Sequence, residues 1–404
     1  MATFVEVAID WAKCFKQPNG EAAILLKSNQ ALAYALSGIQ SPHHFSTAIV
    51  SLLQSPVTLD RNCWIACSYP PTAACVGMAS LLGVTRIVWP GQMGVRSIKL
   101  DRSAVTEQSN KEATVLQVDK KDYKLPQPLP GIKRWFPHYA HLLHNVFDTP
   151  DAARTLIGDL RGADDTAKDN AGLLIALAIA NLAHGSLHNN PTRSLNFQGQ
   201  NIASILVDRN YNILRWGLNT NADNSSLHGE VNLVRSHQGK SPLALPDGGK
   251  LFTTLEPCAM CSGMIVHCAG DGNDFKVVSA QKDEQVKFSY LRPQVTSDGY
   301  SGNRRSVQSS ISSLPLLIGY ACGGEKKQLT SINEYLQDSQ LKHSPSPQQL
   351  MQTTKFLEQH AKPVLSDSVV LLNGMAALWL PSNERDAWRN KLHQLMDHVK
   401  TSVG

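Results

Sequence analysis

The chain has 404 residues, of which 42% are hydrophobic and 18% are charged, and its formal net charge is +5. A chain of this length is too long to fold around one small hydrophobic core, so two or three domains are expected. Eight cysteines without the spacing of a disulfide framework argue against a small disulfide-stapled secreted protein, whereas the modest charge excludes no class of partner. No window reaches the length of a membrane span, and residues 1–10 lack a basic start, so the sequence predicts a cytoplasmic protein without a membrane partner.

Residues 1–95 predict a layered α/β unit, because strand patterns alternate with helix patterns. Apolar runs on both sides of residues 28–30 indicate two strands joined by a turn. A helix is expected to begin near His43. A buried strand over 62–67, a helix over 72–82 and a strand over 84–89 complete the unit.

Residues 96–150 predict a linker or insertion, since polar residues and prolines interrupt the pattern. This segment contains Lys120, Lys121 and Lys124, followed by basic and aromatic residues over 133–136. Such a mixture suits phosphate binding and base stacking. A solvated face whose aromatic residues dock on the neighbouring domain is the simpler interpretation and is favoured.

A second set of alternating elements spans residues 151–330. Its expected elements are a buried helix over 167–187, strands over 202–207 and 212–216, a helix starting near His228 with Ser226 as its cap, a strand over 251–255, a helix over 258–268 and a strand over 275–279. Residues 290–313 predict a polar loop that contains Arg304 and Arg305.

Residues 331–404 predict a helical C-terminal extension. Its last helix carries an apolar stripe, which is more often packed than functional. The stripe consists of Trp388, Leu392, Leu395, Met396 and Val399.

Two short motifs carry the chemistry, His228-x-Glu230 and Pro257-Cys258-x-x-Cys261. One histidine and two cysteines suit a tetrahedral zinc ion whose fourth position is left to water. Glu230 lies close enough in sequence to His228 to move protons in the same site without binding the metal. Each motif sits at a predicted helix start, where backbone N–H groups favour anionic thiolates.

Three other interpretations of these residues are open. A structural zinc site would need a fourth protein ligand, for which Cys268 or His267 is near enough in sequence. A thioredoxin-like redox pair would need no His-x-Glu partner, and a buried, metal-free cysteine pair would leave the order of the surrounding elements unexplained.

With these motifs in place, residues 167–285 resemble the cytidine deaminase superfamily, and most of all the TadA-type tRNA-specific adenosine deaminases. The stretch LFTTLEPCAMCSGMIVHC, residues 251–268, is similar to that family's third strand and metal helix. The resemblance implies an α/β fold with three α-β-α layers. It also implies zinc ligands at His228, Cys258 and Cys261, a proton shuttle at Glu230, and substrate contacts that include Asn219 and Gly229. The family usually has alanine in place of Gly229, and its C-terminal region is not recognisable here.

The resemblance also implies a function, the zinc-dependent hydrolytic deamination of adenosine to inosine in tRNA or other RNA. Cytosine, or a free base, nucleoside or nucleotide, would use the same residues. A protein of a different class, a zinc-stabilised nucleic-acid-binding or scaffold protein without turnover, is the other alternative.

The first domain repeats the plan of the second. Residues 24–26 correspond to 205–207 with an offset of 181, His44 to His228 with an offset of 184, and residues 71–78 to 257–264 with an offset of 186. If the two are copies, residues 1–95 are a degenerate, inactive deaminase-like domain, since Thr72 replaces a thiolate and Ser46 replaces the carboxylate. We expect it to pack on the catalytic domain as an intramolecular pseudo-dimer. Chance similarity and a further homodimer are both left open.

Overall fold

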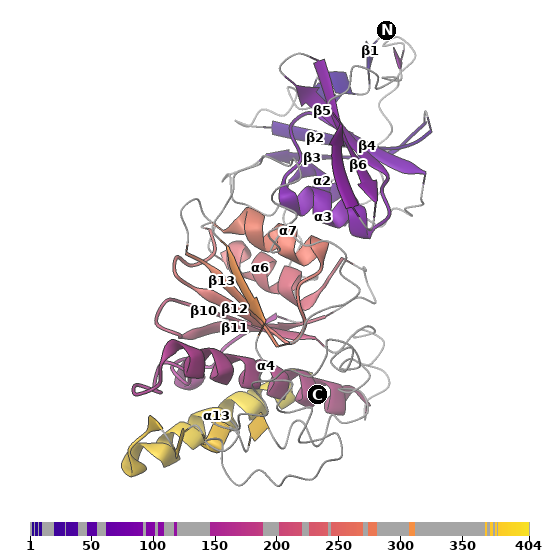
Figure 1. Ribbon diagram of the computed structural model, residues 1–404. Helices are drawn as coiled ribbons and strands as arrows, with labels where there is room; N and C mark the ends of the chain where they lie inside the picture. The colour runs from indigo at the N-terminus through magenta and orange to yellow at the C-terminus, as the bar shows by residue number, and fades with distance from the viewer. Residues whose placement is uncertain are drawn as a thin grey trace, which may run out of the picture.

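The computed structural model describes residues 20–38, 47–54, 62–91, 94–108, 146–188, 202–219, 226–240, 244–269, 274–280, 307–311 and 368–403, with a few short gaps, and brief stretches near the N-terminus and at 117–118. These residues form a stack of layers with the N-terminal unit at one end and the C-terminal helix at the other (Figure 1). Two six-stranded sheets lie in this stack, with helices between them.

The N-terminal sheet has one parallel pair among antiparallel ones. Its strands lie in the order β3 (Gln30–Gly38), β2 (Gly20–Lys27), β4 (Cys63–Cys67), β5 (Arg86–Gly91), β6 (Gly94–Asp101) and β7 (Ala104–Gln108), and β4 and β5 form the parallel pair. Helices α2 (Ala48–Leu53) and α3 (Ala73–Leu81) cover one face, while Val5 and Ala8 pack on the other. The expected hairpin turn at residues 28–30 is confirmed.

The start of residues 96–150, expected to be a linker or insertion with some local structure, extends the N-terminal sheet. Strand β6 continues from β5 through a tight antiparallel hairpin and ends at Asp101, and β7 then pairs with β6. At the other end of the segment, β9 (Val146–Asp148) joins the second sheet. Polar residues hide β7 and β9 in the sequence because both lie at sheet edges, where polar side chains are common.

The second sheet is the centre of three layers, as the sequence predicts. Its strands lie in the order β14 (Gln308–Ile311), β13 (Lys276–Ser279), β12 (Lys250–Thr253), β10 (Ala203–Val207), β11 (Ile213–Leu218) and β9. Helices α6 (Gly229–Lys240) and α7 (Ala259–Cys268) cover one face, and α4 (Asp165–His188) covers the other (Figure 1). Strand β14 runs parallel to β13, so a loop over the whole of residues 290–313 is a wrong expectation.

Alternate residues of the central strands serve the two faces of the second sheet, as the two-residue period of a strand requires. Leu206, Leu251 and Val277 join the core under α6 and α7. Ile205, Phe252 and Val278 join the core under α4. Each strand is therefore apolar on both faces, which explains why the sequence shows continuous apolar runs here.

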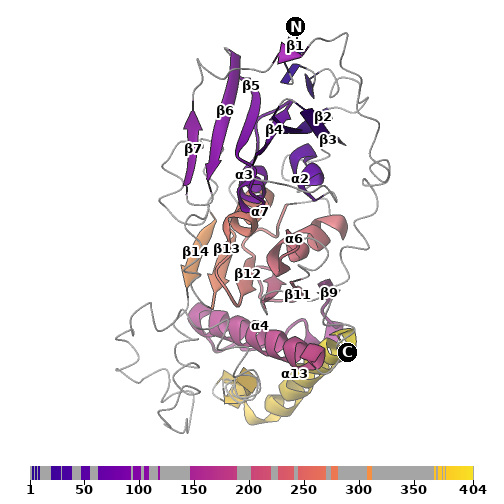
Figure 2. The same cartoon turned by 90° about the vertical axis from the view of Figure 1, so that its right-hand side faces the viewer.

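The C-terminal helix α13 (Ser382–Val403) packs on α4, and the predicted apolar stripe is buried. Figure 2 shows α13 beneath α4, on the side of the molecule away from the N-terminal unit. Trp388 donates a hydrogen bond from Nε1 to the carbonyl of Leu156 at 2.7 Å, and Lys391 Nζ lies 2.6 Å from Asp159. Burial of each large apolar side chain stabilises the fold by roughly 1.5–3 kcal/mol, so this helix is part of the domain core.

The two units meet where α3 lies against α7 (Figure 2). A Cβ atom built on Gly77 would lie 2.2 Å from the carbonyl oxygen of Ala259, and one built on Gly263 would lie 2.3 Å from that of Ala73. Both distances are too short for any side chain, so glycine permits this close approach. The contact is reciprocal, because Gly77 and Ala73 are related to Gly263 and Ala259 by the same offset of 186, which is the pattern of a two-fold interface.

No helix in the parts of the chain described above is both long enough and apolar enough to cross a bilayer.

Candidate metal centre

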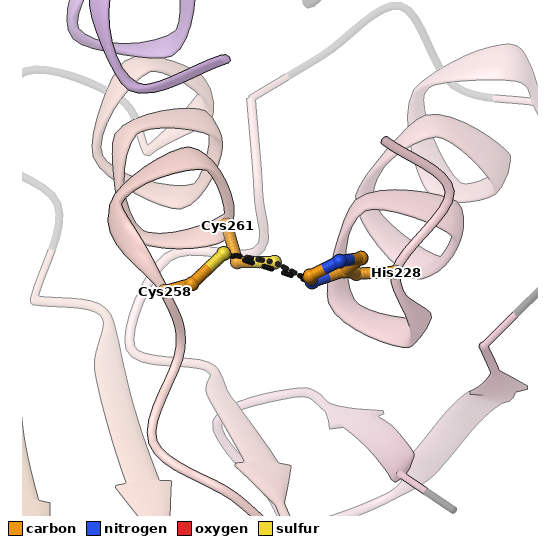
Figure 3. A group of neighbouring side chains, drawn as sticks. All are labelled: His228, Cys258 and Cys261. Carbon is orange, nitrogen blue, oxygen red and sulfur yellow. Dashed lines mark hydrogen bonds between the residues drawn. The ribbon is translucent and has the colours of Figure 1, made fainter. Parts of the chain in front are cut away.

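The side chains of His228, Cys258 and Cys261 meet between the starts of α6 and α7 (Figure 3). The Nδ1 atom of His228 lies 3.6 Å from the Sγ atom of Cys258 and 3.4 Å from that of Cys261, and the two sulfur atoms are 3.5 Å apart. A tetrahedral zinc ion with ordinary Zn–N and Zn–S bond lengths holds its ligand atoms roughly 3.5–3.8 Å apart. The three residues therefore fit zinc in both chemistry and spacing.

Local structure explains why the cysteines point into the site. Cys258 is the N-cap residue of α7, with φ −63° and ψ 174°, and Cys261 lies in the first turn. The free N–H groups of a helix start carry partial positive charge, which favours thiolates there. The contact between the two cysteine sulfur atoms, together with His228, holds the pKa of Cys258 well below its usual value.

Glu230 lies beside the three ligands in the first turn of α6 and is 2% exposed. Its Oε2 atom accepts from the Cys261 thiol at 3.5 Å, and its Oε1 atom accepts from the Thr253 hydroxyl at 3.1 Å. Burial raises the pKa of Glu230, which suits a carboxylate that must take up and release protons. The structure thus brings Glu230 next to the three candidate ligands, and its role as a proton shuttle stays a prediction.

Thr253 was not among the residues expected from sequence. It accepts a hydrogen bond from the Ser204 hydroxyl at 3.1 Å, so two hydroxyls and one carboxylate form a continuous chain. The available signal was a hydroxyl residue beside apolar residues in each of two strands, β10 and β12. Only the strand register shows that the two hydroxyls are opposite each other.

Asn219 and Gly229 lie together at the start of α6. The backbone N–H of Gly229 donates to Asn219 Oδ1 at 2.6 Å, so Asn219 satisfies the helix start for which Ser226 had been the expected cap. A Cβ atom on Gly229 would meet its nearest neighbour at 3.4 Å, an ordinary contact, so the alanine of the family would fit here. A contact of Asn219 or Gly229 with the substrate stays a prediction.

A structural zinc site with a fourth protein ligand gains no support within the described part of the chain. The metal-competent group there contains His228, Cys258 and Cys261 alone. Cys268 lies two turns further along α7, about 10 Å from Cys261 at 1.5 Å per residue. Its thiol donates instead to Gln238 Oε1 at 3.4 Å.

The N-terminal unit has a hydrogen-bonded cluster at the matching place. Thr47 accepts from the Ser51 N–H through its carbonyl at 2.9 Å, as His228 does from Asn232. Thr47 Oγ1 lies 3.1 Å from Cys75 Sγ, and Thr72 Oγ1 donates to the same sulfur at 3.2 Å. Thr47, Thr72 and Cys75 therefore occupy the positions of the three candidate zinc ligands.

This placement corrects one sequence correspondence. Thr47, rather than His44, is equivalent to His228, with an offset of 181 that equals the offset of the preceding strands. Ile49 then takes the place of Glu230 and is fully buried. His44 and Ser46 themselves lie outside the described residues, as do Lys120, Lys121, Lys124, residues 133–136, Arg304 and Arg305.

Part of this chain is similar to known deaminases. Residues 193–287 match the family model of the Bd3614-like deaminases. One matching solved structure comes from a study of A-to-I editing by tRNA deaminases at the wobble position of transfer RNA. That structure is 18% identical in sequence, with a TM-score of 0.24, and the match covers 32% of this chain and 94% of that chain. A guanine deaminase from Nitrosomonas europaea is 19% identical, with a TM-score of 0.22, and covers 32% of this chain and 74% of that chain. No curated protein gives a significant match.

Proposed function

We propose that this chain is a zinc-dependent hydrolase of the cytidine deaminase type that replaces the exocyclic amine of a nucleobase with oxygen, a proposal supported by the match of residues 193–287 to the Bd3614-like deaminase family model. One observation carries the proposal. The ligand atoms of His228, Cys258 and Cys261 lie within 4.8 Å of one another, with the carboxylate of Glu230 directly beside them. Three ligands rather than four are typical of a catalytic zinc site.

Zinc held by these three residues would supply the Lewis acidity that lets water act as a nucleophile at neutral pH. Glu230 takes one proton from the attacking water through Oε2, the oxygen on the side of Cys261. The water oxygen bonds to the ring carbon that carries the amine, and Glu230 passes the proton to the adjacent ring nitrogen. Glu230 then takes the remaining proton from the added hydroxyl and gives it to the amine. The carbon–nitrogen bond breaks, ammonia leaves, and the oxygen stays on the ring carbon as a carbonyl. The reaction is a hydrolysis, so no electrons are exchanged.

For the substrate, we propose adenosine in tRNA or other RNA. The similarity of residues 251–268 to the TadA-type enzymes supports adenine, and a net charge of +5 is compatible with a polyanionic partner. Asn219 and Gly229, which are hydrogen-bonded to each other at the start of α6, are the proposed substrate contacts. Cytosine or a free base would need the same proton transfers, so a product survey must choose among them.

The experiment compares the purified, zinc-loaded chain with its Glu230→Gln variant on tRNA, single-stranded DNA, and free bases and nucleosides. Products are identified by mass spectrometry, and released ammonia is measured. We expect inosine in RNA from the wild type, and no product from Glu230→Gln with its zinc retained. Product from a free nucleoside alone would reassign the substrate. Zinc without turnover on any of these substrates would favour the scaffold interpretation.

We also propose that the N-terminal unit is a degenerate copy of the catalytic unit and that the two form an intramolecular pseudo-dimer. The β2–β3 pairing shifts register between Leu25 and Leu26, and the β10–β11 pairing shifts between Leu206 and Val207, the positions related by the offset of 181. A bulge is a specific backbone feature, so its recurrence at equivalent positions supports common ancestry. The reciprocal glycine contact between α3 and α7 supports the pseudo-dimer.

A further inference from the structure

We propose that Thr253 is a positioning residue for Glu230, and that Ser204 orients the Thr253 hydroxyl. This inference rests on the proposed function and assigns a role to two residues that lie outside the metal-binding motifs. Ser204 Oγ donates to Thr253 Oγ1 at 3.1 Å, and Thr253 Oγ1 donates to Glu230 Oε1 at 3.1 Å.

The direction of these two hydrogen bonds determines how the Glu230 carboxylate is oriented. A hydroxyl has one proton, so Thr253, which accepts from Ser204, directs its own proton at Glu230. The Oε1 atom of Glu230 is thereby engaged, and Oε2 is the oxygen that faces Cys261 at 3.5 Å. The chain of hydroxyls thus fixes the carboxylate with one oxygen turned toward the metal ligands, where the attacking water must be deprotonated.

Burial makes this orientation effective. Ser204 and Thr253 are 0% exposed and Glu230 is 2% exposed, so bulk water does not compete for these hydrogen bonds. The two hydroxyls are directly opposite each other in the register of β10 and β12 and point to the face covered by α6 and α7. A Ser–Thr cross-strand pair on a buried face needs a polar partner, and Glu230 supplies it.

The N-terminal unit provides an internal comparison. The positions equivalent to Ser204, Thr253 and Glu230 are Ala23, Cys67 and Ile49. Ala23 pairs with Cys67 in the register of β2 and β4, as Ser204 pairs with Thr253.

All three N-terminal residues are buried in the core, and the Cys67 thiol donates to the carbonyls of Tyr69 and Val88 instead. The same sheet therefore forms without the hydroxyls. They occur only in the copy that has the carboxylate, which points to a role in its chemistry.

The test compares Thr253→Val, which removes the hydroxyl at nearly constant shape, with Thr253→Ser, which keeps it. We expect Thr253→Val to retain its zinc and its KM while kcat falls about 10- to 100-fold, the usual effect of losing a residue that orients a catalytic group. Thr253→Ser should recover most of kcat. The matched control is Ser279→Ala, which removes a buried hydroxyl from the position of β13 paired with Thr253; this hydroxyl has no hydrogen-bond partner among the described residues.

A second readout does not depend on activity. In a double-mutant cycle on urea unfolding, Thr253→Val should destabilise the wild-type protein more than it destabilises the Glu230→Ala variant, because the hydrogen bond exists only when both partners are present. Equal effects in the two backgrounds would overturn the inference. So would a Thr253→Val variant with wild-type kcat, or one that loses its zinc.

These failures are distinct from failure of the proposed function. An inactive wild type would remove the deaminase assignment, whereas an active wild type with an insensitive Thr253 would remove only the positioning role.

Discussion

The N-terminal and second units have a similar arrangement of strands and helices, but different side chains meet at their helix starts. In the catalytic unit, His228, Cys258 and Cys261 converge with the spacing of zinc ligands. At the same places in the N-terminal unit, Thr47 and Thr72 form hydrogen bonds with Cys75. Two hydroxyls and a thiol satisfy one another there, so the fold does not require a metal. The arrangement of strands and helices therefore does not depend on the three candidate zinc ligands of the second unit.

The strand that follows the shared core also differs. Strand β6 returns antiparallel to β5 through a short hairpin, whereas β14 runs parallel to β13. A parallel neighbour requires the chain to cross back before it enters the sheet, and this takes a much longer connection than a hairpin. The N-terminal sheet thus ends in a short hairpin connection, and the second sheet ends in a longer crossover connection.

The sharpest way to test this comparison is the same substitution at equivalent positions, Cys261→Ser and Cys75→Ser. We expect wild type to bind one zinc per chain, Cys261→Ser to bind none and lose deaminase activity, and Cys75→Ser to keep both. The reason is that serine is a poor zinc ligand, while at Cys75 it only replaces a hydrogen-bonded thiol. Metal content by mass spectrometry and ammonia release measure the two outcomes.

Two zinc ions per wild-type chain would contradict the assignment of an inactive copy. Loss of zinc from Cys75→Ser, with the fold intact by circular dichroism, would show that the N-terminal cluster takes part in metal binding.

Sequence alone predicted the features that depend on local patterns. The His-x-Glu and Cys-x-x-Cys motifs indicated side chains that the structure brings together. Alternating strands and helices predicted layered α/β units, and the family resemblance predicted the three layers around the second sheet. The apolar stripe from Trp388 to Val399 correctly indicated a docked helix.

What the sequence did not predict depends on contacts between distant segments. Thr47 corresponds to His228 because both residues lie at the start of a helix, and an alignment by residue type does not show where a helix starts. The polar edge strands β7 and β14 lack an apolar pattern, and the pairing of Ser204 with Thr253 is set by strand register. None of these leaves a short motif in the chain.

A second test concerns the side chain that accepts a hydrogen bond from the first backbone N–H of α2 in the N-terminal unit and of α6 in the second unit. In the catalytic unit a neutral amide, Asn219, accepts from the Gly229 N–H, whereas in the N-terminal unit the carboxyl of Glu21 accepts from the Ala48 N–H at 3.2 Å. Burial raises the pKa of Glu21 from 4.5 to about 8. Between pH 4.5 and 8 the folded protein therefore keeps a proton on Glu21 that the unfolded chain releases. Because proton release favours the unfolded chain, the free energy of unfolding falls as the pH rises toward 8.

We expect the free energy of unfolding to fall by up to about 1.4 kcal/mol per pH unit across this window through Glu21, and Glu21→Gln to abolish that slope. Denaturant unfolding of both proteins at pH 5, 6, 7 and 8 measures the difference. Parallel pH profiles for wild type and Glu21→Gln would show that Glu21 is ionised in the folded protein.

The smallest effect expected concerns the interface between the two units. Gly77→Ala and Gly263→Ala each place a Cβ atom within 2.3 Å of a backbone carbonyl on the opposite helix, so α3 and α7 must move apart. We expect each to lower the free energy of unfolding by about 1–3 kcal/mol, and by similar amounts because the contact is two-fold. Gly229→Ala is the matched control, since its Cβ atom meets nothing closer than 3.4 Å.

The double variant Gly77→Ala/Gly263→Ala then distinguishes one interface from two independent packing sites. If both glycines serve the same two-fold contact, the first substitution already separates α3 from α7, and the second costs less than it does alone. Urea unfolding of the four proteins gives this coupling directly. Additive effects, or a cost at only one glycine, would contradict the pseudo-dimer, because a symmetric contact cannot be opened on one side while its equivalent stays closed.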